Sequence, residues 1–315
     1  MKNIRTDLAI EAREMYSEDR DVEIPGVKVD QEENEDYTVT RIEIMDDRGK
    51  EVMKKEKGIY ITIESKYLSF DDEESRNTIV GCVSGELNKL FGDQNNKKTL
   101  IIGLGNWNIT SDALGPKTVS KTLVTRHLFK AYNKEEDKDL SEVAALSPGV
   151  MGITGIETSE TVKALVDMIK PDRVVAIDAL ASRKLERVNT TIQISTAGIS
   201  PGAGIGNIRK SLNEEYLNVP VIAIGVPTVV DAATLTSDVI DMTIDNLIKE
   251  SSSGKEFYNM LKELKEEEKY TLIKELLEPF DQNVVVTPKD IDEIIDNLAI
   301  ILSMSLNKSL HPGIN

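Results

Sequence analysis

Two aspartates in similar surroundings are the residues of this chain best suited to catalysis. Asp112 comes shortly after the apolar run 100–102 and the glycine-containing turn 103–106, and Asp178 directly follows the apolar run 173–177. Each aspartate begins an Asp-Ala-Leu tripeptide. Continuous apolar runs predict strands that are buried on both faces. Open α/β sheets bind ligands beyond the carboxyl ends of such strands, so we expect both aspartates in loops at that edge.

The two aspartates predict a carboxylate pair, although their spacing also permits a structural role. Like charges held close together do not both ionise cheaply, so the pair would share one proton and act as general acid and general base. In the structural alternative, one aspartate caps a helix and the other accepts a backbone N–H. Spacing alone leaves both interpretations open.

Glycine-containing loops near the aspartates supply further candidates for the site. Gly103, Gly105 and Asn106 belong to the turn before Asp112, and Gly149 belongs to a Pro-Gly loop. We expect the backbone amides of the three glycines to stabilise a developing oxyanion, with Asn106 lining the same site.

Another glycine-rich segment, residues 201–207, has the pattern Gly-x-Gly-x-Gly. The dinucleotide-binding pattern is Gly-x-Gly-x-x-Gly directly after a strand, whereas this segment follows a loop. We therefore expect a backbone-lined groove or a subunit contact here and not a phosphate site.

The composition argues against several classes of protein. The chain has 315 residues and a net charge of −17, which disfavours binding to the phosphates of nucleic acids. No apolar run is long enough for a transmembrane helix, and the N-terminus has no hydrophobic signal core. The single cysteine, Cys82, excludes an internal disulfide, predicts a reducing intracellular compartment and is expected to be a packing residue. Two histidines, His127 and His311, are too few for a multi-histidine metal site and supply a serine triad poorly.

Strands and helices alternate along the chain, which predicts an α/β fold with a mostly parallel sheet. Apolar runs and helical periodicity are the basis of the expected elements. The expected strands are at 100–102, 143–146, 173–177, 190–195, 221–225 and 284–286, and the expected helices are at 73–91, 117–132, 158–170, 232–248 and 291–306.

The two ends of the chain are expected to depart from this alternation. Residues 1–35 are polar and acidic and predict a flexible arm. The alternating segments 37–44 and 59–63, joined by a turn at 46–49, predict a small antiparallel unit before the main sheet. Residues 251–254 predict a linker.

The sequence resembles the germination proteases of spore-forming bacteria, the endopeptidases that degrade small acid-soluble spore proteins. The resemblance extends over nearly the whole chain, from Thr6-Asp7-Leu8-Ala9 to Val286-Thr287-Pro288-Lys289. The motifs that carry it are long and specific, and they lie at residues 103–106, 111–116, 125–129, 148–158, 176–183, 186–189, 201–207 and 225–232.

The resemblance implies a fold and a division of the chain. The fold would be related to that of the hydrogenase maturation proteases, a mostly parallel sheet flanked by helices, with a small N-terminal antiparallel unit. Residues 1–7 would be a propeptide, and residues 8–315 a single peptidase domain with a helical surface appendage at 250–280. In three places the sequence departs from the family: Ser111 replaces an expected proline, the segment 250–270 is shorter, and the N-terminal arm is short, with six residues before Asp7.

The resemblance also implies the chemistry. The two proposed catalytic aspartates of the family correspond to Asp112 and Asp178, so the reaction would be an aspartic-type hydrolysis without a cofactor or a bound metal. The family is made as zymogens and cuts after the acidic residue of the pattern Thr-acid-hydrophobic-Ala. Residues 6–9 have this pattern, which would place self-cleavage between Asp7 and Leu8.

The partners and the location follow from the same resemblance. The substrates would be small acid-soluble spore proteins, and the protein would be a homotetramer with no nucleic-acid or membrane partner. It would work in the cytoplasm of the forespore, which becomes the spore core.

Two other functions are compatible with the same residues. In a metal-assisted peptidase, Asp112 and Asp178 would hold a hard cation, since the shortage of histidine argues against zinc but not against oxygen-bound ions. The same sheet would also suit a non-catalytic nucleotide-binding or scaffold protein.

Overall fold

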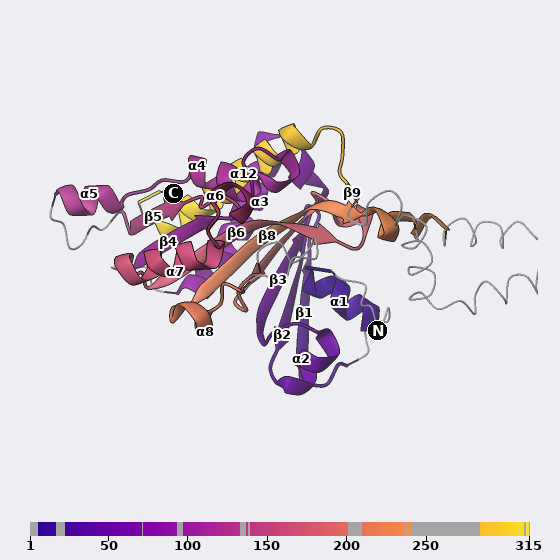
Figure 1. The fold of residues 1–315 in the computed structure, drawn as a ribbon. Helices are drawn as coiled ribbons and strands as arrows, with labels where there is room; N and C mark the ends of the chain where they lie inside the picture. The colour runs from indigo at the N-terminus through magenta and orange to yellow at the C-terminus, as the bar shows by residue number, and fades with distance from the viewer. Residues whose placement is uncertain are drawn as a thin grey trace, which may run out of the picture.

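The protein is built around one mixed β-sheet with helices on both faces (Figure 1). The computed structural model describes residues 6–16, 23–70, 72–92, 97–132, 137, 139–200, 210–236, 238–240, 284–311 and 313–314. Within these ranges the sheet has nine strands in the order β1-β2-β3-β7-β8-β6-β4-β5, and β9 pairs with β8 beside this path. The predicted α/β fold is confirmed, but the sheet is mixed and not mostly parallel, because β7 continues it into the antiparallel N-terminal strands.

One half of the sheet is parallel. β4 (Lys98–Gly103), β5 (Glu142–Leu146), β6 (Arg173–Ser182) and β8 (Val221–Asp231) run in the same direction. β6 and β8 are buried over nearly their whole length because helices cover both faces, which explains their continuous apolar runs. The helix α7 (Thr158–Ile169) connects β5 to β6, in the strand-helix-strand order that the sequence predicts.

The other half of the sheet is antiparallel. β7 (Thr191–Ser195) pairs with β8 on one side and with β3 (Gly58–Glu64) on the other. β2 (Thr38–Ile44) and β1 (Val27–Glu33) continue the antiparallel order, and β9 (Val285–Val286) pairs with the end of β8. The predicted N-terminal antiparallel unit is confirmed, and β7 joins it to the parallel half in a single sheet.

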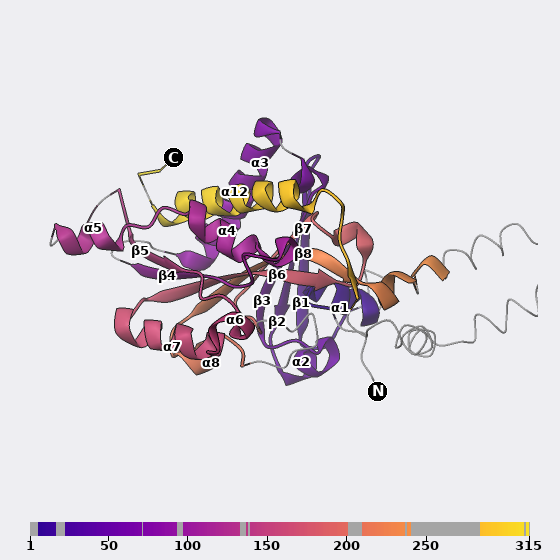
Figure 2. The same cartoon turned by 45° about the horizontal axis from the view of Figure 1, so that its top comes forward.

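Helices cover the parallel half from both sides (Figure 2). α3 (Glu73–Phe91), α4 (Leu114–Lys121) and the long α12 (Ile291–Leu310) lie on one face, and α3 and α12 supply much of the main hydrophobic core. α7 and α8 (Glu214–Leu217) lie on the opposite face, where α7 packs against β4 and β6.

The N-terminal segment is part of the folded body. α1 (Ala9–Tyr16) packs near α2 (Asp47–Met53), and Leu8 is completely buried in a cluster that includes Ile42. The predicted flexible arm over 1–35 is therefore wrong for the described residues. The apolar triplet Leu8-Ala9-Ile10 in this segment is too short to give a periodic signal, and only tertiary contacts reveal that it is buried.

The helix predicted at 117–132 is two helices, α4 and α5 (Arg126–Ala131). The chain between them is held to β5, because the hydroxyl oxygen of Thr125 accepts a hydrogen bond from the N–H of Val143 at 2.9 Å. A side chain that bonds to the backbone of a neighbouring strand offers the chain an alternative to a continuous helix.

The turn predicted at 46–49 is the start of α2. Asp46 is the N-cap of this helix, and its carboxylate accepts hydrogen bonds from the N–H groups of Arg48 and Gly49, both at 3.0 Å. Capping satisfies N–H groups that have no partner within the helix, so it favours a helix over a tight turn.

Some predicted elements fall outside the described residues, namely the glycine-rich segment 201–207, the linker 251–254 and the appendage 250–280. Of the helix predicted at 232–248, residues 232–236 and 238–240 are helical. Among the described helices, none has the length and apolar character needed to cross a membrane.

The close packing of α4 on the sheet gives a test of the fold. A Cβ on Gly115 would lie 2.3 Å from the carbonyl oxygen of Leu104 and 2.6 Å from that of Ile177. We expect Gly115→Ala to lower the free energy of unfolding by about 1–3 kcal/mol, measured by urea denaturation. Gly81→Ala in α3 is the matched control: a Cβ there meets nothing within 4 Å, so stability should rise by about 0.5–1 kcal/mol. Equal stability of Gly115→Ala and the wild type would contradict this packing.

Candidate active site

Asp112 and Asp178 line one cavity of about 620 Å³. The cavity lies where the parallel and antiparallel halves of the sheet meet, with residues of β6 and β8 on one side and of β7 and β3 on the other. The short helix η2 (Thr110–Asp112) and the end of α2 complete its wall. The structure therefore brings the two predicted aspartates to the same cavity.

Asp178 lies inside β6. The sequence predicts it in a loop after this strand, and that prediction is wrong. β6 continues to Ser182 because its second half keeps pairing with β8. The aspartate is 5% exposed, and its Oδ1 accepts a hydrogen bond from the N–H of Ala179 at 3.0 Å. Gly225 stands opposite on β8, where a Cβ would lie 2.4 Å from a methyl carbon of Leu180.

Asp112 is half-buried and is held by the turn before it. The N–H of Asn106 donates to the carboxylate Oδ2 at 2.8 Å and to the main-chain oxygen of Asp112 at 3.1 Å. Gly105 has a φ of 109°, and a Cβ there would lie 2.0 Å from that main-chain oxygen, so the turn requires glycine. Thr228 Oγ1 on β8 donates to the carbonyl oxygen of Ser111 at 2.6 Å and anchors the loop to the sheet.

The other site candidates are not part of the cavity wall. None of Gly103, Gly105, Asn106 and Gly149 is among the described residues that line it. Asn106 and Gly105 shape the turn that orients Asp112, and the carbonyl oxygen of Gly149 accepts a hydrogen bond from the hydroxyl of Thr158 at 3.4 Å. The expected role of the glycine amides at an oxyanion stays a prediction.

The N-terminal segment of the chain reaches the same cavity. Asp7 is one of its lining residues. The N–H of Asp7 donates to the carbonyl oxygen of Ala181 at 3.3 Å, and the N–H of Ala181 donates to Asp7 Oδ2 at 2.9 Å. Leu8 and Ala9, which follow, are completely buried. The expected cleavage position thus lies against β6, the strand that carries Asp178.

Two side chains hold the backbone of this segment. Lys55 Nζ donates to the carbonyl oxygen of Thr6 at 2.7 Å. Gln193 Nε2 donates to the carbonyl oxygen of Asp7 at 3.1 Å, and Gln193 Oε1 accepts from the N–H of Ala9 at 2.6 Å. Both side chains line the cavity, so the segment 6–9 is bound by residues of the candidate site.

Neither of these residues is predicted from the sequence. Gln193 carries a usable signal, because it is a polar residue between two isoleucines in a strand, and a buried amide needs partners. Lys55 carries none, since it is one of several lysines in a charged stretch. In the structure, burial lowers the pKa of Lys55, and the carboxylates of Asp7 and Glu11 partly offset this effect.

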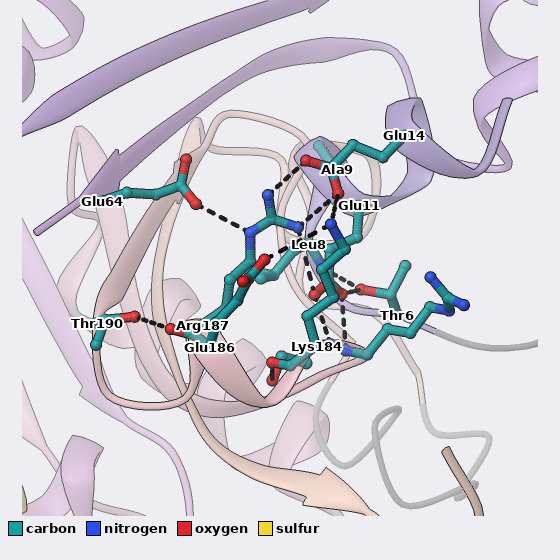
Figure 3. A network of polar contacts seen from close by, with 12 residues as sticks. Thr6, Leu8, Ala9, Glu11, Glu14, Glu64, Lys184, Glu186, Arg187 and Thr190 are labelled. Carbon is teal, nitrogen blue, oxygen red and sulfur yellow. Dashed lines mark hydrogen bonds and ion pairs between the residues drawn. The ribbon is translucent and has the colours of Figure 1, made fainter. Parts of the chain in front are cut away.

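A network of ion pairs fastens α1 to the segment after β6 (Figure 3). Arg187, in the short helix η3 (Leu185–Arg187), donates to the two carboxylate oxygens of Glu14 at 2.6 and 2.8 Å. Its Nε donates to Glu64 at 2.9 Å. The side chain of Arg187 is only 6% exposed, so these contacts are largely shielded from water.

Glu11 extends the network toward the cavity. Its carboxylate accepts hydrogen bonds from the N–H groups of Arg183 and Lys184 at 2.8 and 2.9 Å and from the hydroxyl of Thr6, and it lies 3.6 Å from Arg187. Glu11 is 1% exposed, and a buried charge is tolerated only when it is paired and hydrogen-bonded. The network therefore fixes where the segment 6–9 lies.

Other reactive side chains have structural surroundings. Burial raises the pKa of Cys82 to about 11, with a smaller contribution from Glu86, and this thiol packs against the main core. His311 is completely buried, its Nδ1 accepts from the N–H of Ser141 at 3.3 Å, and burial lowers its pKa. In the described ranges, no three or more histidine, cysteine, aspartate or glutamate side chains are grouped so that they could hold a metal ion.

The fold and the cavity first define a class of protein. The chain is a mixed α/β protein in which two aspartates line one cavity of the sheet, in the region where α/β enzymes bind their substrates. The sequence model of the germination proteases matches residues 7–261 and 243–315. The chain belongs to the germination protease family, and it is therefore a protease of spore germination that acts on protein substrates.

Curated relatives match over nearly the full length. The chain is 49% identical to the germination protease of Caldanaerobacter subterraneus subsp. tengcongensis over 99% of this chain and 95% of the relative. It is 48% identical to that of Clostridium tetani (99% and 97%) and 41% identical to that of Bacillus mycoides (99% and 95%). A solved [NiFe] hydrogenase maturation protease, HycI of Thermococcus kodakarensis, is similar at a TM-score of 0.28 and 17% identity, over 45% of this chain and 80% of that one.

The ion network makes stability depend on pH. Burial tends to raise the pKa of Glu14, but its hydrogen bonds and charge attraction to Arg187 and Lys184 outweigh burial and lower the pKa below the ordinary 4.5. A carboxyl group with a lowered folded-state pKa stabilises the fold above its unfolded-state pKa, and this contribution is lost as the pH falls through the folded-state value.

We therefore expect Glu14→Gln to flatten the fall of the free energy of unfolding below a pH of about 4.5, measured by urea denaturation at a series of pH values. Glu160→Gln, at an exposed position of α7, should keep the pH dependence of the wild type. The account of the network fails if the two variants give the same curve.

Proposed function

We propose that this protein is an aspartic-type endopeptidase in which Asp112 and Asp178 hydrolyse the peptide bond. We also propose that it is made as a zymogen, which removes residues 1–7 by cutting between Asp7 and Leu8. The observation that carries the proposal is that Asp7, Asp112 and Asp178 line the same cavity.

The proposed reaction needs one proton shared between the two aspartates. One carboxylate takes a proton from a water molecule, whose oxygen attacks the carbonyl carbon, while the protonated carboxyl group donates to the carbonyl oxygen. Collapse of the tetrahedral intermediate breaks the C–N bond, and the carboxyl group that took the proton from the water gives it to the leaving amine. General acid–base catalysis of this kind contributes roughly 10²–10⁴-fold in rate.

The surroundings of the segment 6–9 support its role as a substrate. Leu8 and Ala9 are completely buried, as expected for a sequence pattern that demands a hydrophobic residue and alanine after the cut. Residues 6–8 precede α1, which begins at Ala9, so they are not helical, and the backbone of the segment 6–9 is bound by Ala181, Lys55 and Gln193. These are the contacts that a peptidase needs in order to hold a peptide backbone in place.

The remaining parts of the proposal rest on the resemblance of the sequence to its family. The substrates are small acid-soluble spore proteins, cut after the acidic residue of the pattern Thr-acid-hydrophobic-Ala. A disordered substrate can enter the cavity without the free-energy cost of unfolding first. The protein is a homotetramer with residues 8–315 as its peptidase domain, and it acts in the forespore and spore core.

The proposal is tested by self-processing of purified protein, followed by intact mass. We expect the wild type to lose residues 1–7, and Asp112→Asn and Asp178→Asn each to be at least ~10²-fold slower with unchanged circular dichroism. Asp167→Asn, which removes an exposed carboxylate of α7, should process at the wild-type rate. The assignment of the two aspartates as the catalytic pair is wrong if Asp112→Asn or Asp178→Asn processes itself almost normally. If the wild type stops processing when a chelator is present, the metal-assisted alternative is favoured.

A further inference from the structure

Gln193 contacts the backbone on both sides of the bond after Asp7. Its amide donates to the carbonyl oxygen of Asp7 and accepts from the N–H of Ala9, at 3.1 and 2.6 Å. Both contacts are made to the main chain, so they are available to any peptide in the same position. Gln193 is 7% exposed and lies on β7, a strand held between β3 and β8, so its position is firmly set.

The donor atom of Gln193 lies where negative charge would develop during hydrolysis. When water attacks the carbonyl carbon of the residue before the cut, the carbonyl oxygen becomes an oxyanion. A positioned amide donor at this oxygen is worth roughly 10²–10³-fold in kcat. Among the residues that the structure describes, Gln193 makes this contact through its side chain, whereas the glycines expected in this role do not line the cavity.

Lys55 brings a positive charge to the side of Asp7. Its ammonium donates to the carbonyl oxygen of Thr6 at 2.7 Å, and it attracts the carboxylate of Asp7. The carboxylate of Asp7 also accepts a hydrogen bond from the N–H of Ala181 at 2.9 Å. An asparagine could accept the same hydrogen bond, whereas the positive charge of Lys55 favours an acidic residue over its amide.

We propose that Lys55 selects the acidic residue before the cut and that Gln193 stabilises the carbonyl oxygen of that residue during hydrolysis. This inference rests on the proposed function, since it assumes that the segment 6–9 is bound as a substrate. Protein substrates would take the same contacts once the chain's own segment has left the cavity.

The selectivity of Lys55 is tested by a double-mutant cycle on self-processing. The four proteins are the wild type, Asp7→Asn, Lys55→Met and the double variant, with the rate of loss of residues 1–7 measured by intact mass. We expect Asp7→Asn to slow processing by about tenfold or more in the wild type and by less than about twofold in Lys55→Met. If Asp7→Asn slows processing by the same factor in the wild type and in Lys55→Met, Lys55 does not select the acidic residue.

A matched control lies in the same cavity wall. Lys50 also lines the cavity, but its ammonium is paired with Glu56 at 2.6 Å. In a Lys50→Met background, Asp7→Asn should slow processing by the same factor as it does in the wild type. If Lys50→Met abolishes that factor as well, the positive charge of the wall in general, and not Lys55, selects the acid.

The role of Gln193 is tested with processed enzyme and a peptide that contains Thr-Asp-Leu-Ala. We expect Gln193→Met to lower kcat by roughly 10²-fold with a smaller change in KM, because the contact strengthens as the oxyanion forms. Thr191→Val is the control: this residue is on the same strand, and its buried hydroxyl has no hydrogen-bond partner among the described residues, so the variant should behave as the wild type. An effect of Gln193→Met on KM alone would overturn the oxyanion role.

Asp112→Asn in the same assays distinguishes failure of this inference from failure of the proposed function. If Asp112→Asn is inactive while the cycle at Lys55 is additive and Gln193→Met is normal, this inference fails and the proposed function stands. If Asp112→Asn is active, the proposed function itself fails.

Discussion

The pairing of the buried Glu11 carboxylate is the interaction on which the candidate site depends. A charge that is 1% exposed requires partners, and Glu11 finds them in Arg187 and in two backbone N–H groups of the segment after β6. This fastens the start of α1 next to the strand that carries Asp178. Residues 6–8 have no regular structure of their own, so their position beside the cavity follows from this anchor and from the burial of Leu8.

The second constraint is the junction between the two halves of the sheet. β8 pairs in parallel with β6 and antiparallel with β7, so strands from both halves face one cavity. β6 supplies Asp178, and β7 supplies Gln193. The antiparallel half of the sheet is therefore more than an extension of the α/β core, because Gln193 lies on its strand β7 and Lys55 lies just before its strand β3.

Much of the fold could be predicted from local patterns, and the contacts of the site could not. Periodicity identified the helices now seen as α3 and α7, and the apolar runs identified β4 and the first half of β6. The position of Asp178 within β6 depends on pairing with β8, which no local pattern encodes. The contacts of Gln193 with Asp7 and Ala9 join residues more than 180 positions apart, and the burial of Leu8 depends on β2 and α2.

A mixing experiment tests whether the chain presents its own bond after Asp7 to its own carboxylates. Wild-type protein is incubated with a mass-tagged Asp112→Asn chain over a wide range of concentrations, and the loss of residues 1–7 is followed for both by intact mass. The account predicts a wild-type rate that does not depend on concentration and a tagged chain that keeps its full mass. Trimming of the tagged chain as fast as the wild type, or a rate that rises with concentration, would contradict it.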